Sequence, residues 1–109
     1  MQPQQETEFI GYINLLIDRT NESKMTWLQH NPTTYIWKPA PNQNIRLIIQ
    51  RTSSSPLIYS FQAIDQNNET QMSVINVSVG VNQTLHRLFM TIENMRDKKS
   101  LSFLKSIMP

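Results

Sequence analysis

LIYSFQAIDQNNETQMSVINVSV, residues 57–79, is the stretch that decides the fold. Its first half alternates between two sets of side chains, as a β-strand does, and one set is Leu57, Tyr59, Phe61 and Ala63. The polar run at 66–69 indicates a hairpin loop, and the segment 70–79 alternates again. We therefore expect two antiparallel strands joined by a short turn.

Three further strands are expected before this hairpin, at residues 25–29, 33–38 and 44–52. They are separated by short breaks that contain Pro32, Pro39, Pro41 or a serine run, and these residue types favour turns. Short connections between successive strands predict an antiparallel meander.

One helix is expected on each side of the strands. In residues 6–21, Phe9 and Ile13 begin an apolar stripe of helical period, after a frayed leader at 1–5. A second helix is expected to start near Asn82, a good N-cap residue, and to bury Leu85 and Leu88. A separate short helix is expected at 100–108, where Ser100 would be its cap.

The expected fold class is α+β, with 1–109 forming a single domain. A meander of four or five antiparallel strands should carry the N-terminal and C-terminal helices on one face, plus the short terminal helix. Several strands have apolar residues on both faces, so the second face is expected either to be covered or to meet a partner.

Composition excludes several classes of site. The chain has no cysteine, which rules out disulfides and thiolate zinc sites, and its net charge of +2 is too weak to indicate nucleic-acid binding alone. The start of the chain has neither the basic nor the apolar run of a signal peptide, and no stretch is long enough for a membrane span. We expect a cytoplasmic protein.

The residues that catalysis requires are scarce. The only histidines are His30 and His86, no serine lies in a Gly-x-Ser-x-Gly elbow, and no metal-binding spacing occurs. Gly11 and Gly80 are the only glycines, too few for a phosphate-binding loop. We predict a non-enzymatic protein with no catalytic, cofactor-binding or metal-binding residues.

The favoured function is a protein–protein interaction or accessory module that binds another protein or a second copy of itself. Its main evidence is the apolar end of the chain, which follows a basic segment and resembles a docking helix, although packing against its own sheet is the simpler alternative. Two residues lie off the buried helical stripes, one in each long helix. The predicted partner-binding residues are Leu15, Met90, Leu101, Leu104, Ile107 and Met108.

Weak nucleic-acid binding is the alternative hypothesis. Aromatic residues such as Tyr35, Trp37, Tyr59 and Phe61 would stack on bases if the sheet exposed them, but the same residues would also make a good core. The basic residues assigned to this alternative are Lys38, Arg46, Arg51, Arg96, Lys98 and Lys99.

Overall fold

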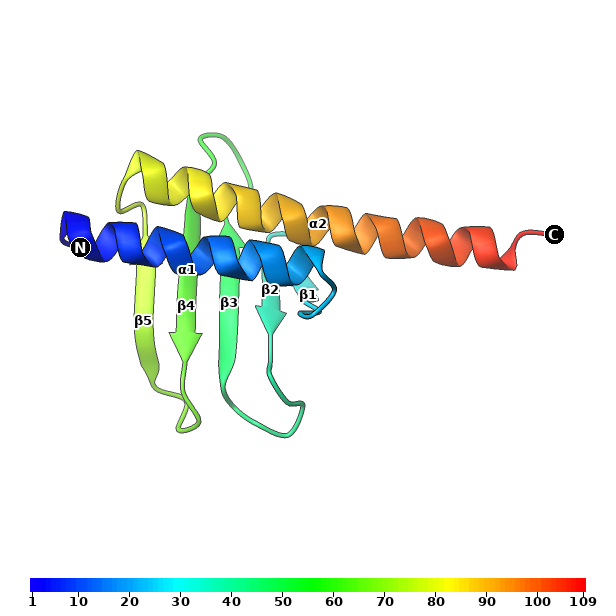
Figure 1. Cartoon of the computed structure of the whole chain (residues 1–109), viewed down its shortest axis with the longest axis horizontal. Coiled ribbons are helices and arrows are strands. Elements are labelled where there is room, and N and C mark those ends of the chain that lie inside the picture. Colours follow the sequence, from blue (N-terminus) through cyan, green and yellow to red (C-terminus); the bar gives the residue numbers. More distant parts are fainter.

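Two long helices lie on one face of a five-stranded sheet (Figure 1) in the computed structural model, which describes residues 1–109. The elements, in chain order, are α1 (Pro3–Asn21), β1 (Leu28–Asn31), β2 (Thr34–Trp37), β3 (Arg46–Arg51), β4 (Tyr59–Ile64), β5 (Thr70–Ile75) and α2 (Val79–Ile107). The strands pair in the order β1-β2-β3-β4-β5, and every pair is antiparallel. The expected α+β class and the meander are therefore confirmed.

The register of the sheet sets the core. Tyr35, Ile49, Phe61 and Val74 are paired in turn across β2 to β5, and each is at most 4% exposed. This row packs against the helices, and the ring of Phe89 on α2 contacts Tyr35 edge-on at 5.2 Å between centroids. Alternate residues of each strand therefore supply the core, as the periodicity predicted.

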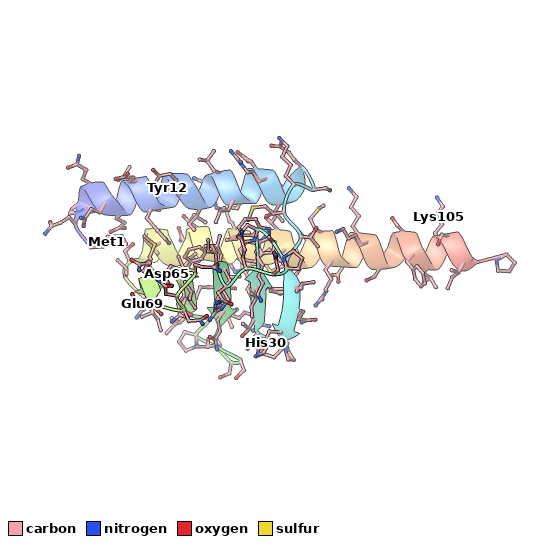
Figure 2. The ribbon with its side chains drawn as sticks, turned by 90° about the horizontal axis from the view of Figure 1, so that it is seen from below. Met1, Tyr12, His30, Asp65, Glu69 and Lys105 are labelled. Carbon is pink, nitrogen blue, oxygen red and sulfur yellow. The ribbon has the colours of Figure 1, made fainter.

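The two helices run in the same direction, and α1 packs mainly against α2 (Figure 1). Seen along the strands, α1 lies farther from the sheet than α2 does (Figure 2). The ring of Phe9 still reaches Phe61 on β4, at 5.8 Å between centroids. Consequently α2 covers the centre of the sheet closely, while α1 is bridged to it only by its larger side chains.

The second helix begins at Val79, three residues earlier than expected. Ser78 is its N-cap, and the Ser78 hydroxyl accepts a hydrogen bond from the Val81 N–H at 3.1 Å. Asn82, the expected cap, instead accepts from the Tyr59 N–H at 2.8 Å and donates to the Leu57 carbonyl at 3.1 Å. The asparagine therefore joins the helix to β4 and the loop before it.

The expected separate helix at 100–108 does not exist, because α2 continues without a break to Ile107. No glycine or proline occurs between Val81 and Met108, so nothing in the sequence ends the helix at Ser100. Ser100 has the side chain of a typical N-cap residue, but it lies inside a 29-residue helix.

Helix α1 and strand β1 also begin at residues other than those expected. α1 begins at Pro3, within the expected leader, because proline favours the first helical position and the Gln5 side chain accepts from the Gln2 N–H. β1 begins at Leu28 instead of at residue 25. Met25 and Trp27 turn into the core before it, and the Trp27 indole N–H donates to the Thr20 hydroxyl at 3.0 Å.

No helix covers the second face of the sheet. Leu28, Ile36 and Ile48 are paired in turn across β1 to β3 on this face, and Leu28 is 68% exposed. The row continues through Gln62 and Ser73 on β4 and β5, so it becomes polar toward that edge. This row is thus apolar only in the β1–β3 half, and Ile75 on β5, paired with Ser60, is a further exposed apolar residue of the same face.

Candidate functional site

The end of α2 projects beyond the sheet and beyond the end of α1 (Figure 1). We call residues 98–107 the α2 extension; ten helical residues span about 15 Å. Every residue from Arg96 to Pro109 is exposed. The exposed apolar side chains and their exposed fractions are Leu101 (66%), Phe103 (66%), Leu104 (51%), Ile107 (60%) and Met108 (63%). The extension therefore does not pack on its own sheet.

The α2 extension is amphipathic. At about 100° per residue, its four apolar side chains from Leu101 to Ile107 fall within an arc of roughly 160°. Lys98, Lys99 and Lys105 fall in the opposite arc, and none of them forms an ion pair. Figure 2 shows Lys105 directed away from the side on which the sheet lies. Apolar and basic residues thus occupy separate faces of the same exposed helix.

The structure brings together most of the predicted partner-binding residues. Met90 is 39% exposed and shares a helical face with Leu101 and Leu104, at spacings of 11 and 14 residues. Ile107 and Met108 follow at the tip. Leu15, 48% exposed on α1, belongs to a different surface, the groove between α1 and the sheet. The predicted set is therefore divided between two places.

That groove has a volume of about 460 Å³. Its floor includes Trp37, Leu47 and Met72, which are paired through Ala63 in the row next to the buried one. Ala63 carries only a methyl group and α1 lies away from the sheet, so this row is left partly uncovered. The other lining residues are Phe9, Tyr12, Ile13, Leu15, Leu16, Arg19, Lys24, Met25 and Phe61.

The sequence did not predict this groove. Its walls come from α1, four strands and the loop before β1, and periodicity within one element cannot show that they converge. Trp37, expected to be a core anchor, is only half buried and lines the groove, whereas Trp27 is buried. The signals available in the sequence were Trp37 itself, Tyr12, which widens the apolar stripe of α1, and Leu15, which lies off that stripe.

The aromatic residues considered for base stacking are mostly in the core. Tyr35, Tyr59 and Phe61 are at most 4% exposed beneath the helices, so their faces are not offered to a nucleic acid. Their burial raises the pKa of both tyrosines above the ordinary value. The hydroxyl of Tyr35 accepts a hydrogen bond from Arg96 at 2.9 Å, and that of Tyr59 lies 2.6 Å from Nδ1 of His86. Both polar tips thus bind α2.

The basic residues assigned to nucleic acid are dispersed. Arg46 donates to Asn44 and Asn68, and Arg51 lies over the Phe89 ring at 5.2 Å. Arg96 binds Tyr35 and pairs with Asp97, and that hydrogen bond to Asp97 raises the pKa of Arg96. Only three of the six remain without a partner side chain: Lys38, Lys98 and Lys99.

The histidines do not form a catalytic arrangement with a nucleophile. His30 is exposed on β1, and His86 contacts Tyr59. No group of three or more His, Cys, Asp or Glu side chains is arranged to hold a metal ion. Neither α1 nor α2 combines the length and the apolar character needed to cross a membrane.

Comparisons with protein-family models, with curated proteins and with solved structures gave no match to this chain. The function of the chain is therefore inferred from its own residues.

Proposed function

We propose that the protein is a non-enzymatic protein–protein interaction module and that the α2 extension is its docking surface. The observation that carries the proposal is the exposure of five apolar side chains at the end of a helix that continues out of the domain. Burying such side chains in an interface is favourable, at about 25 cal/mol per Å² of apolar surface. A helix with one apolar face is a recurring recognition element for a groove on another protein.

The charge of the extension indicates what kind of partner surface would fit it. Residues 96–109 carry four cations and one carboxylate, a net charge of +3, and the lysines flank the apolar arc. A partner surface with an apolar centre and acidic edges fits this pattern. Residues 1–24 of the same chain have a net charge of −2, so a second copy offers acidic residues to a docked extension.

Light scattering across a concentration series is the test. We expect a species larger than the 12.8 kDa monomer, with a proportion that rises with protein concentration. Leu104→Asp places a charge in the apolar arc and should abolish association. Ser102→Asp is the matched control, because it adds the same charge on the opposite face of the extension and should leave association intact.

Circular dichroism of both variants separates association from folding. Helical spectra equal to that of the wild type are expected, since both positions are exposed. A wild type that stays monomeric at all concentrations would exclude self-association and leave another protein as the proposed partner. Equal association of the two variants would overturn the role of the extension.

Nucleic-acid binding stays a weaker proposal, supported only by the unpaired lysines Lys98 and Lys99 beside Lys105. Phosphate contacts would make affinity fall steeply as salt rises. Absence of binding to single- or double-stranded DNA and RNA at low salt would exclude it.

A further inference from the structure

A second surface, distant in sequence from the α2 extension, has the character of a ligand site. The groove between α1 and the sheet has a volume of about 460 Å³, within the usual range for small-molecule sites. A neighbouring groove of about 540 Å³ shares Phe9, Tyr12 and Met72 with it, so the hollow continues along the underside of α1. Ten of the twelve residues that line the first groove are apolar.

The remaining two lining residues are both cations. Arg19 lies in the last turn of α1 and Lys24 in the loop that follows, so both come from one end of the groove. Lys24 is already paired with Glu22 at 2.8 Å, and this pairing lowers the pKa of that carboxyl. The guanidinium of Arg19 makes no hydrogen bond or ion pair. An apolar channel thus ends at an unpaired arginine.

This combination selects a class of ligand. An apolar chain would lie over Trp37, Leu47 and Met72, and an anionic head group would meet Arg19, whose fork of N–H donors matches a carboxylate. We infer that the groove binds a free carboxylate with a medium or long aliphatic chain. The basic α2 extension of a second copy suits this end of the groove less well, because its lysines would approach Arg19 and Lys24.

Dodecanoate, below its micelle concentration, is the probe, and calorimetry measures its binding. We expect saturable binding of one molecule per chain. Lengthening the chain from octanoate to dodecanoate should raise the affinity at least about tenfold, since each buried methylene contributes and the groove buries them in part. Dodecyltrimethylammonium, with the same chain and a positive head, should bind about tenfold more weakly. Equal affinities for the two head groups would overturn the inference.

Two variants place the ligand. Arg19→Gln should weaken dodecanoate binding about threefold to fivefold, as expected for an exposed charge pair, and should leave the dodecyltrimethylammonium affinity unreduced. Lys98→Gln, the matched control, removes a cation that does not line the groove and should change neither. Fluorescence adds a local readout: Trp37 should respond to the ligand, and Trp37→Phe should lose that response.

The inference is independent of the proposed interaction function, and one variant separates the two. Leu104→Asp lies outside the groove, so it should bind dodecanoate with wild-type affinity whether or not it associates. Binding by Leu104→Asp but not by the wild type would overturn the inference for the wild-type protein, because the extension of a second copy would then occupy the groove. Absence of binding by both proteins would overturn it as well, and light scattering would still test association.

Discussion

Both halves of α2 carry apolar side chains at helical spacing, but their surroundings differ. In the first half Leu85, Leu88 and Phe89 are 0% exposed, whereas in the second half Leu101 and Phe103 are each 66% exposed. The helix is continuous through both. Apolar periodicity therefore shows that a helix has a face to bury, but the length of the sheet beneath it decides whether the chain itself buries that face.

The largest expected effect comes from truncating the buried half. Phe89→Ala removes a ring that contacts Tyr35, Tyr59 and Arg51, and should lower the free energy of unfolding by about 3–5 kcal/mol. Leu104→Ala, in the exposed half, should change it by less than about 0.5 kcal/mol once association is excluded. Urea unfolding at low protein concentration measures both. Similar losses at the two positions would show that the extension packs against the domain.

An intermediate effect is expected where α2 is joined to β4. Asn82→Ala leaves the Tyr59 N–H without its acceptor and should cost about 1–2 kcal/mol. Ser78→Ala removes the true N-cap and should cost about 1 kcal/mol. Circular dichroism measures the helicity of both variants. A loss of helicity in Asn82→Ala, with no loss of stability or helicity in Ser78→Ala, would show that Asn82 is the N-cap and would contradict the assignment to Ser78.

These two residues show what the sequence could and could not predict. The buried face followed from alternation at Tyr59 and Phe61, because a half-buried strand needs that pattern. The strand order followed from the short connections between successive strands. The start of α2 did not follow, since serine and asparagine both suit an N-cap and only tertiary contacts assign Asn82 to β4. The predicted helix boundary at Ser100 was wrong for a similar reason. Serine suits an N-cap, but α2 continues through Ser100, so no helix begins there.

The candidate sites were predictable to different degrees. The apolar end of α2 is visible in the sequence as a run of apolar residues that follows a basic segment. Leu101 and Leu104 could therefore be selected from the sequence. The groove depends on the distance between α1 and the sheet and on the pairing of Trp37 with Leu47. Distances between elements and strand register are tertiary properties, and no single segment encodes them.

A smaller effect is expected at alkaline pH, and it is confined to the buried region. Burial raises the pKa of Tyr35 and Tyr59 above about 10, so the folded state holds both protons where the unfolded state loses them. The resulting stabilisation is fully present below about pH 10 and is lost as pH rises through the folded-state values. Urea unfolding from pH 8 to 11 should show this decline, and Tyr59→Phe should reduce it. A decline of unchanged size in Tyr59→Phe and in Tyr35→Phe would contradict the assignment.

The smallest effect is expected when the exposed end is removed. Deleting residues 101–109 should leave the free energy of unfolding within about 0.5 kcal/mol of that of Leu104→Asp with residues 1–109 intact, because no deleted residue is buried. Leu104→Asp is the right reference, since a self-associating wild type gains stability from its partner as concentration rises. We expect the free energy of unfolding of the wild type to exceed that of both other proteins only at high protein concentration. A deletion that costs more than about 2 kcal/mol at low concentration would show that α2 depends on its exposed half, and the contrast between the two halves would then be lost.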